Sequence, residues 1–337
     1  MPEGINRQWL LASRPDGPVG DHNFRWTKSP IPSASEGQVL VQNLWLSLDP
    51  TQILFMADDS ENPVVPIGGV MRAVAVARVV ESRLPGFEVG DLVHGFFGWE
   101  DFSTTDGEAD VPMTKVPVTT PPNLALGTFG LTGMAAYFGL LEIGRPRKGE
   151  TFVVSGAAGG VGTIAGQIAK IHGLRVIGIA GGKEKCAWLT SEVGFDGAID
   201  YRAQDVGARL SELCPDGIDI FFDNVGGAVL DTALEHLRRN GRVVLCGATP
   251  RYAQKARPPG PTNYFALVIE RARMEGFFAS DFRERFPEAR DALALWLRSG
   301  QLKSKEDVVV GLENAPKALA RLFTGANLGK QMLRIVE

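Results

Sequence analysis

The sequence predicts an α/β protein in which a doubly wound parallel sheet of six strands is inserted into a β-rich domain. From Thr151 onward, short β-branched runs alternate with stretches of helical periodicity. Before about residue 125, alternating apolar and polar runs are instead punctuated by proline and glycine. The end of the chain resembles its beginning more than its middle. We therefore expect a β-rich domain of residues 1–126 and 302–337, and an inserted parallel-sheet domain of residues 127–301.

The N-terminal part contains three strand candidates and one loop candidate. Strands are expected at residues 38–45, 70–80 and 92–94, bounded by turn residues. The polar stretch at residues 58–63 predicts an exposed loop, and a mobile lid is the alternative. The aromatic stretch Gly95–Trp99 indicates core packing at a sheet corner, with a wall of the substrate pocket as the alternative.

The rest of the chain begins with a buried helix predicted over residues 127–141. Strands are expected at 152–155, 175–180, 198–200, 218–222, 242–246 and 274–278. Helices are expected between them at 160–172, 184–193, 204–213, 228–238 and 263–273. The remaining elements are a helix at 287–298, a strand at 307–310, a helix at 316–323 and a strand at 331–336. Strands joined by helical crossovers form a parallel sheet with helices on both faces.

The composition is that of an ordinary soluble globular protein. The chain has 337 residues, 22% of them charged, and a net charge of -4 without a dense basic block, which argues against nucleic acid or an anionic membrane as partner. No apolar run of about 18 residues predicts a transmembrane helix. The N-terminus lacks the apolar core of a signal peptide. The three cysteines are far apart, which indicates reduced thiols and a cytoplasmic location.

The stretch Thr151–Gly162, TFVVSGAAGGVG, combines a buried strand, a glycine turn and the start of a helix. Gly156, Gly159 and Gly162 have the spacing of a dinucleotide-binding turn, in which the glycines permit a tight turn, close approach of the pyrophosphate and close packing of helix and strand. The helix N-terminus then directs N–H groups at the phosphates. This pattern predicts a Rossmann-type dinucleotide site, and a plain strand-turn-helix connection is the alternative.

The end of the second strand indicates which nicotinamide cofactor is bound. An acidic residue there binds the ribose 2′-OH of NAD and repels a 2′-phosphate. Here the strand ends in Gly181-Gly182 and is followed by Lys183 and Lys185, so NADP is favoured. In the alternative interpretation the lysines are the solvated start of a helix, in which Glu184 complements the helix dipole.

Metal ligands are sparse in the β-rich half of the chain. It contains no cysteine, and its histidines, His22 and His94, are isolated in the sequence. A catalytic zinc site needs three protein ligands, so a metal-free hydride transfer is expected. No GxSxG motif is present to support a Ser-His-Asp hydrolase.

Four motifs carry a resemblance to a known family. VVSGAAGGVG, FDNVGG (Phe222–Gly227), RARMEGFF (Arg271–Phe278) and LFTGANLGK (Leu322–Lys330) resemble the zinc-independent medium-chain dehydrogenase/reductases, in the double-bond reductase branch of prostaglandin, plant alkenal and bacterial curcumin reductases. The resemblance covers nearly the whole chain. It implies a GroES-like catalytic domain around the Rossmann-type sheet, a homodimer, and NADPH-dependent reduction of the C=C bond of α,β-unsaturated ketones and aldehydes.

The resemblance also implies a set of residues that contact the cofactor. The pyrophosphate turn corresponds to Ala157, Gly159, Gly160, Val161 and Gly162, and the end of the second strand to Gly181. The 2′-phosphate contacts correspond to Lys185 and Tyr201. The nicotinamide half corresponds to Thr132, Asn224, Cys246, Gly247, Tyr252, Phe277, Phe278 and Asn327.

The implied mechanism transfers a hydride from NADPH to the β-carbon of the enone. Tyr252 or a bound water would stabilise the enolate, and Tyr252 or solvent would protonate the α-carbon. A loop tyrosine that only packs on the ribose is the alternative for Tyr252. The chain departs from the family at Thr51-Gln52-Ile53 and at Pro250, which bears on substrate preference.

Two other functions remain open from the sequence. An NADPH quinone reductase on the same scaffold and a non-catalytic NADPH-binding protein are compatible with the same cofactor motifs. The strand-like sequence MEGFF (Met274–Phe278) is expected near the edge of the sheet, where a second subunit would continue the pairing.

Overall fold

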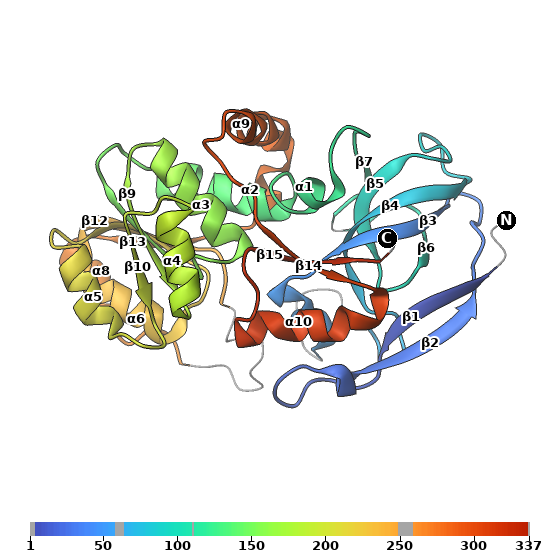
Figure 1. Ribbon diagram of the computed structural model, residues 1–337, viewed down its shortest axis with the longest axis horizontal. Coiled ribbons are helices and arrows are strands. Elements are labelled where there is room, and N and C mark those ends of the chain that lie inside the picture. The colour runs from blue at the N-terminus through green and yellow to red at the C-terminus, as the bar shows by residue number, and fades with distance from the viewer. Residues whose placement is uncertain (1–3, 58–63, 110, 249–258, 336–337) are drawn as a thin grey trace. The chain divides into compact units, whose positions relative to one another are not determined.

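The computed structural model describes residues 4–57, 64–109, 111–248 and 259–335 (Figure 1). The chain forms two compact units. The first unit comprises Met1–Leu126, Glu306–Asn327 and Gln331–Glu337, and the second comprises Gly127–Lys305 and Leu328–Lys330. Both ends of the chain therefore belong to the same unit.

The first unit is built on antiparallel strands. Its elements are β1 (Ile5–Leu11), β2 (Phe24–Pro30), β3 (Val39–Ser47), β4 (Arg72–Ser82), β5 (Leu92–Gly98), β6 (Phe102–Thr105), β7 (Thr114–Lys115), α1 (Pro122–Leu126), β14 (Glu306–Val310), α10 (Ala315–Thr324) and β15 (Lys330–Arg334). In the described part of the chain the main sheet has the order β14-β15-β3-β4-β5-β7, β6 pairs with β3, and β1 and β2 form a hairpin. The predicted β-rich, GroES-like part is confirmed.

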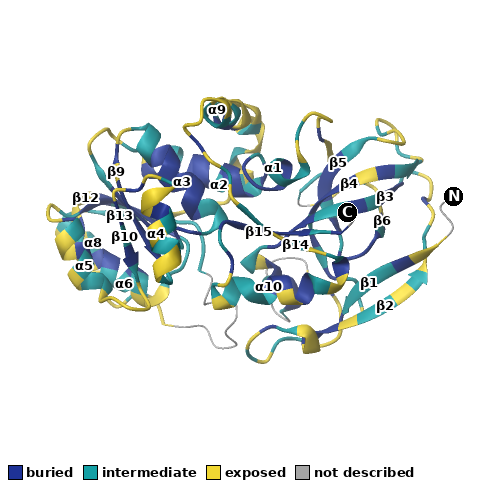
Figure 2. Ribbon diagram, viewed as in Figure 1, coloured by how far each residue is buried: buried dark blue, intermediate teal, exposed yellow. Residues whose placement is uncertain are grey.

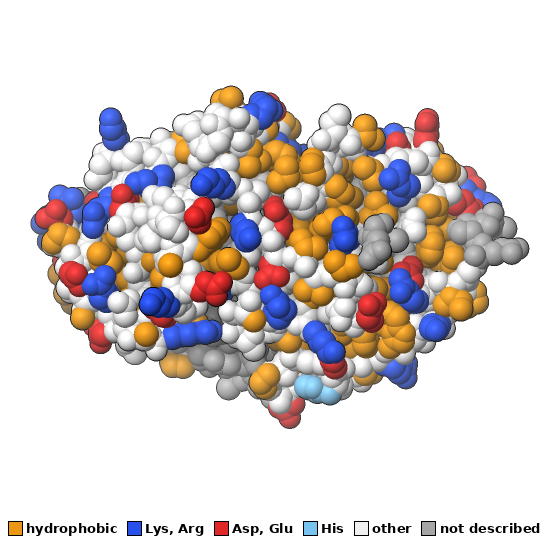
Figure 3. All heavy atoms as spheres, in the orientation of Figure 1, with side chains coloured by type: hydrophobic (Ala, Val, Ile, Leu, Met, Phe, Trp, Pro, Cys, Tyr) orange, Lys and Arg blue, Asp and Glu red, His pale blue; other side chains and the backbone are white. Residues whose placement is uncertain are grey.

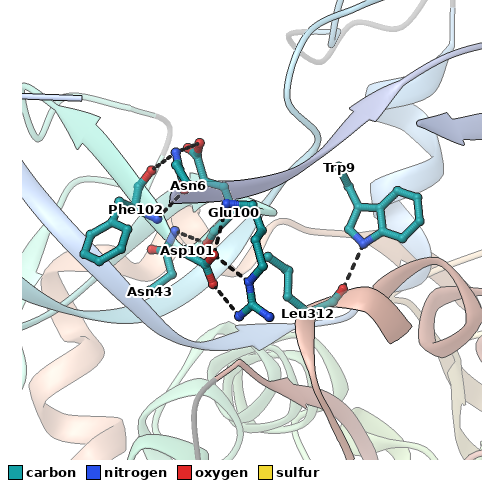
Figure 4. Close-up of polar contacts among 8 residues, drawn as sticks. Asn6, Trp9, Asn43, Glu100, Asp101, Phe102 and Leu312 are labelled. Atoms are coloured by element: carbon teal, nitrogen blue, oxygen red, sulfur yellow. Dashed lines mark hydrogen bonds and ion pairs between the residues drawn. The ribbon is translucent and has the colours of Figure 1, made fainter. Parts of the chain in front are cut away.

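Buried polar side chains connect the β1–β2 hairpin to the main sheet (Figure 4). The Glu100 carboxylate accepts hydrogen bonds from Asn6 Nδ2 at 3.0 Å, Gln8 Nε2 at 2.6 Å and Ser103 Oγ at 2.7 Å. Burial raises the pKa of Glu100, and these three donors oppose that shift because they stabilise the charged form. Glu100 thus connects β1, which carries Asn6 and Gln8, to β6, which carries Ser103.

The second unit contains the predicted parallel sheet. Its elements are α2 (Leu131–Phe138), β8 (Thr151–Ser155), α3 (Gly160–Ile171), β9 (Arg175–Ala180), α4 (Lys183–Ser191), β10 (Gly197–Asp200), α5 (Val206–Leu213), β11 (Ile218–Asp223), α6 (Gly227–Glu235), β12 (Leu237–Leu245), α8 (Ala266–Glu270), β13 (Arg273–Gly276) and α9 (Phe286–Arg298). Among the described residues the strand order is β10-β9-β8-β11-β12-β13, and the pairs are parallel. The predicted six-stranded, doubly wound sheet is confirmed.

Helices cover both faces of this sheet, whose strands are largely buried (Figure 2). Phe152 and Val154 of β8 face the cluster formed with α2, α3 and α9, whereas Val153 between them faces the cluster formed with α5 and α6. This alternation follows from the two-residue period of a strand and explains why the run is apolar on both faces.

Several predicted boundaries in this unit are wrong, among them the start of the strand expected over 242–246 and the extents of two helices. The helix expected over 228–238 ends at Glu235, because β12 starts at Leu237, which pairs with Ile218 of β11. The helix expected over 263–273 is reduced to α8, because Arg271 adopts a left-handed conformation at φ 50° and β13 begins at Arg273. In both places pairing across the sheet overrides the local helical pattern.

The aromatic stretch Gly95–Trp99 belongs mainly to β5 and its end. Trp99 is fully buried and its ring stacks on Phe24 with centroids 5.2 Å apart. Phe97 is also buried. The prediction that this stretch packs in the core is therefore confirmed for Phe97 and Trp99. The loop predicted at residues 58–63 lies outside the described residues.

The described residues show the surface charges, the character of the helices and the state of the cysteines. On the face shown in Figure 3, basic and acidic side chains are interspersed. No helix among the described residues is long and apolar enough to cross a bilayer. Cys186, Cys214 and Cys246 are all free thiols.

Candidate functional site

The site lies where the strand order of the parallel sheet reverses. From β8 the chain proceeds outward through β9 and β10 on one side, and β11 then pairs with the opposite side of β8. In open α/β sheets, ligands bind beyond the carboxyl ends of the strands at such a switch point. The segments that follow β8, β9 and β11 are therefore the candidate ligand-binding segments.

The glycine turn after β8 requires its glycines. Gly156 has a φ of +59°, which favours glycine, and its carbonyl accepts from the N–H of Gly159 at 2.9 Å. A Cβ on Gly162 would lie 2.5 Å from the oxygen of Gly156 and 2.8 Å from the Cα of Ala157. The predicted tight turn and close packing are thus explained by backbone contacts within the turn.

The first turn of α3 leaves its N–H groups available to a ligand. Gly159 is the N-cap residue, and in the described structure no side chain caps the helix. The N–H of Thr163 makes the first bond back, to the carbonyl of Gly159 at 3.0 Å, so the N–H groups of Gly160, Val161 and Gly162 precede the hydrogen-bonded ladder. Such N–H groups, together with the helix dipole, form an anion site.

The segment Leu328–Lys330, which belongs to the second unit, packs against this turn. The N–H of Gly329 donates to the carbonyl of Ala158 at 2.8 Å, and Gly159 and Gly329 form a parallel bridge. A Cβ on Gly160 would lie 2.9 Å from the methyl carbon of Thr132 and 3.1 Å from Cδ of Lys330. Thr132 therefore packs against the turn, and a residue larger than glycine at position 160 would displace it.

The ends of β9 and β10 lie side by side. Gly181 follows β9, and a Cβ on it would lie 2.8 Å from the hydroxyl of Tyr201 and 2.9 Å from Nε of Arg202. Tyr201 is 48% exposed. Lys185 is half-buried in the first turn of α4. Gly181, Lys185 and Tyr201 are the residues predicted for this end of the cofactor, and Arg202, which was not among the predicted residues, lies beside them.

The ends of β8 and β11 are joined by a polar network. Oγ of Ser155 donates to Oδ1 of Asp223 at 2.7 Å, and the same oxygen accepts from the N–H groups of Val225 and Gly226. Asn224 donates through its N–H to Oγ of Ser155 and through Nδ2 to the carbonyl of Ser155, both at 2.8 Å. This network fixes the segment that contains the predicted Asn224, and sequence reasoning missed Ser155 and Asp223.

The buried environment raises the pKa of both Asp223 and Cys246, and the Cys246 thiol is a poor nucleophile because it stays protonated. Burial raises the pKa of Asp223, and three hydrogen bonds to its charged form oppose the shift. Burial and the neighbouring Asp223 raise the pKa of the Cys246 thiol to about 12. The N–H groups of Cys246 and Gly247 donate to the carbonyl of Asp223, so both predicted residues are held beside this network.

The predicted residues after β13 differ in environment. Phe277 packs against the core, whereas Phe278 is 75% exposed. The N–H of Phe278 donates to Oδ2 of Asp281 and its carbonyl accepts from the N–H of Asp281, so both backbone groups are engaged locally. Asn327, 8% exposed, directly precedes the segment that braces the glycine turn.

The structure describes one of the two places where the chain departs from the family, Thr51–Ile53. Tyr252 and Pro250 lie outside the described residues. Gln52 is buried in a 3₁₀ turn, Pro50–Met56, and its Nε2 donates to the carbonyls of Ser47 and Arg72. This residue of the Thr51–Ile53 departure therefore has a structural role in the first unit.

Two family models match the chain: "N-terminal domain of oxidoreductase" over residues 7–113 and "Zinc-binding dehydrogenase" over residues 160–294. The chain is 41% identical to the NADPH-dependent curcumin reductase of Escherichia coli strain K12 over 336 residues, which covers 98% of this chain and 97% of that one. This chain belongs to the medium-chain dehydrogenase/reductase family. It falls in the double-bond reductase branch, as the resemblance implied.

Two further relatives support this assignment within the family. The NADP-dependent 2-alkenal reductase of Nicotiana tabacum is 39% identical over 323 residues, 91% of this chain and 90% of that protein. The structure of CurA from Vibrio vulnificus in complex with NADPH superposes with a TM-score of 0.92 at 40% identity, and the match covers 98% of this chain and 99% of that one. The fold of this branch therefore extends over nearly the whole chain.

The name of the second family model mentions zinc, but the described residues do not form a ligand set for a metal ion. Within the described residues, no group of three or more His, Cys, Asp or Glu side chains is placed to hold a metal ion. The first unit contains no cysteine in its sequence.

Proposed function

We propose that this protein is an NADPH-dependent enone reductase, which reduces the C=C bond of α,β-unsaturated ketones and aldehydes. The observation that carries the proposal is the paired arrangement at the switch point: a glycine turn that presents free helix N–H groups, and a neighbouring strand end with Gly181 in place of a carboxylate. Membership of the double-bond reductase branch supports the reaction type.

The chain's own residues fit the cofactor. The N–H groups of Gly160, Val161 and Gly162 would hold the pyrophosphate, and Lys185 and Tyr201 the 2′-phosphate. When bound, NADPH supplies the hydride for the β-carbon. The second unit, and residues 127–301 in particular, would thus form the dinucleotide-binding domain. The β-rich domain of residues 1–126 and 302–337 would form the substrate and catalytic part.

The nicotinamide half of the site would be formed by the other predicted residues. They are Thr132, Asn224, Cys246, Gly247, Phe277, Phe278 and Asn327. Asn224 suits this role because two hydrogen bonds to Ser155 fix its position. Phe278 contributes through its backbone only if its hydrogen bonds to Asp281 rearrange, so it is the weakest member of this set.

Tyr252 is proposed as the group that donates a hydrogen bond to the enolate oxygen and protonates the α-carbon, with solvent as its rival for the proton. Tyrosine is a weak acid with a pKa of about 10, so its hydroxyl is protonated at neutral pH and available as a donor. The chain also lacks a ligand cluster that would support zinc as a Lewis acid in its place, in the part that the structure describes. We therefore propose zinc-independent chemistry.

A homodimer is proposed from the outer edge of the parallel sheet. Among the described residues β13 pairs only with β12, which leaves its other edge open to a second copy. The adjoining segment Tyr264–Ile269 exposes four large hydrophobic side chains, of Tyr264, Phe265, Val268 and Ile269, each 56–61% accessible. Exposed apolar side chains in the segment that leads into an edge strand suit pairing with an identical copy.

The proposed cellular setting is the cytoplasm, where free Cys186, Cys214 and Cys246 remain reduced. The proposed partner is a small-molecule enone or enal.

Parallel assays of NADPH oxidation test the function. Benzylideneacetone, trans-2-hexenal, benzoquinone and a simple alcohol with NADP are compared under identical conditions. An enone reductase consumes NADPH with the first two. Turnover of benzoquinone alone would favour the quinone reductase, and tight NADPH binding without turnover would favour the non-catalytic protein.

A further inference from the structure

Arg202 is held in place by the ends of two neighbouring strands. β9 and β10 are parallel, and Asp200 pairs with Ala180 at their carboxyl ends. Oδ1 of Asp200 accepts from the N–H of Gly182 at 2.8 Å and from the N–H of Arg202 at 3.0 Å. One carboxylate oxygen therefore connects the segment after β9 to the segment after β10, and it fixes the backbone from which Arg202 extends.

The side chain of Arg202 reaches back over the end of β9. A Cβ on Gly181 would lie 2.9 Å from Nε of Arg202 and 2.8 Å from the hydroxyl of Tyr201, so a side chain there would require both of these exposed side chains to shift. The guanidinium carbon lies 5.9 Å from the centroid of the Tyr201 ring. Both polar groups thus occupy the space that a side chain at position 181 would take.

The position over Gly181 is where an acidic side chain selects NAD in other dinucleotide folds. Here the same space receives a guanidinium and a phenol, and Lys185 lies in the adjoining first turn of α4. A guanidinium offers a planar fork of N–H donors that matches a phosphate, and it remains charged at any working pH. This combination fits a phosphomonoester dianion on the ribose.

We propose that Arg202 is a specificity-determining residue that binds the 2′-phosphate of NADPH together with Tyr201 and Lys185. The proposal rests on the NADPH dependence proposed above and adds to it a residue that neither the motifs nor the resemblance assigned. Arg202 supplies a donor fork, and Gly181 supplies the space that the fork needs. Preference for NADPH over NADH therefore depends on a glycine and an arginine that are 21 positions apart in the sequence, residues 181 and 202.

Binding of small adenine nucleotides tests the proposed role of Arg202 without any need for turnover. Titration calorimetry compares 2′,5′-ADP with 5′-AMP, which differ by the 2′-phosphate, on the wild type, Arg202→Gln and Arg298→Gln. Arg298 ends α9 on the same unit and is also exposed, so it is the matched control for loss of a surface charge. We expect Arg202→Gln to weaken 2′,5′-ADP binding about tenfold or more, as expected for a lost charge-assisted hydrogen bond. Affinity for 5′-AMP should stay within about twofold, since no phosphate contact of that ligand is removed.

Three results separate the possibilities. If the wild type does not prefer 2′,5′-ADP to 5′-AMP, the proposed NADPH dependence itself fails. If the wild type prefers 2′,5′-ADP but Arg202→Gln keeps that preference, the role of Arg202 is refuted. A loss that is equal for both ligands, or equal in Arg298→Gln, also overturns it, because it would reflect a structural or general charge effect.

Arg202→Lys tests whether the planar shape of the guanidinium matters for binding the 2′-phosphate. Arg202→Lys keeps the charge and loses the planar fork, so we expect 2′,5′-ADP affinity between those of the wild type and Arg202→Gln. Raising the salt concentration should reduce the difference between wild type and Arg202→Gln, because Arg202 is exposed and its charge is screened. A gap between the two proteins that is independent of salt would contradict an ionic contact.

Discussion

Oγ of Ser155, the last residue of β8, donates a 2.7 Å hydrogen bond to Oδ1 of Asp223, the last residue of β11. Asp223 is 1% exposed and its other carboxylate oxygen has no hydrogen-bond partner in the described structure. The two strands that flank the switch point are therefore joined by a buried carboxylate. That carboxylate accepts from the N–H groups of Val225 and Gly226 and so organises the segment that contains Asn224.

Asp223→Asn should change how stability depends on pH. Burial raises the pKa of Asp223 above its unfolded value of about 3.9, so between these values the folded state binds more protons than the unfolded one. The contribution of Asp223 to the free energy of unfolding therefore falls as pH rises through that window, and it stays low above it. Asp223→Asn has no carboxyl group at this position, so its free energy of unfolding does not fall with rising pH for this reason. Urea unfolding of both proteins from pH 4.5 to pH 8 should show the variant gaining relative to wild type as pH rises, and parallel curves would contradict the assignment.

Gly162→Ala should weaken NADPH binding at least about tenfold, which is 1.4 kcal/mol. The added methyl would meet the oxygen of Gly156 and the Cα of Ala157, which are backbone atoms, so the turn must move. Quenching of protein fluorescence by NADPH measures the dissociation constant. Gly207→Ala in α5 is the control, because a Cβ there meets its nearest atoms at an ordinary 3.4 Å. Unchanged affinity in Gly162→Ala would show that the turn does not hold the cofactor.

Tyr252→Phe should lower kcat about 100-fold if the hydroxyl protonates the α-carbon, at the lower end of general acid catalysis. The affinity for NADPH should be unchanged, because the ring is retained. Stopped-flow measurement of NADPH oxidation gives the rate, and fluorescence titration gives the affinity. A rate equal to that of the wild type would assign the proton to solvent.

Val268→Glu should convert the proposed dimer to a monomer. Val268 is 61% exposed on α8, which precedes β13, and two such helices facing each other would bury the new charges together. Sedimentation velocity measures the mass of the protein in solution. Leu295→Glu, on α9 and 57% exposed, is a control that should leave the mass unchanged. A wild type that sediments as a monomer would refute the dimer directly.

Local patterns were sufficient to predict the parallel sheet and the glycine turn. The strand at 152–155 and the helix from 160 agree with β8 and α3, because the two-residue and 3.6-residue periods are properties of neighbouring residues. The early start of β12 at Leu237 was not predictable in this way, because it depends on pairing with Ile218.

The missed site residues share one physical cause. Ser155 and Asp223 are 68 positions apart and meet only because β8 and β11 are neighbours in the sheet. Arg202 is near Gly181 only because β9 and β10 are neighbours. Their positions in the sequence were the available signal, because each of these residues ends a predicted strand or lies within two residues after one.

The most direct test of the central claim follows the hydride itself. The protein is incubated with benzylideneacetone and NADPH that carries two deuterium atoms at C4 of the nicotinamide, and the product is analysed by NMR and mass spectrometry. The proposed function predicts the saturated ketone with one deuterium on the carbon that was β to the carbonyl. An allylic alcohol with deuterium on the carbinol carbon, or no deuterated product under conditions where NADPH binds, would contradict it.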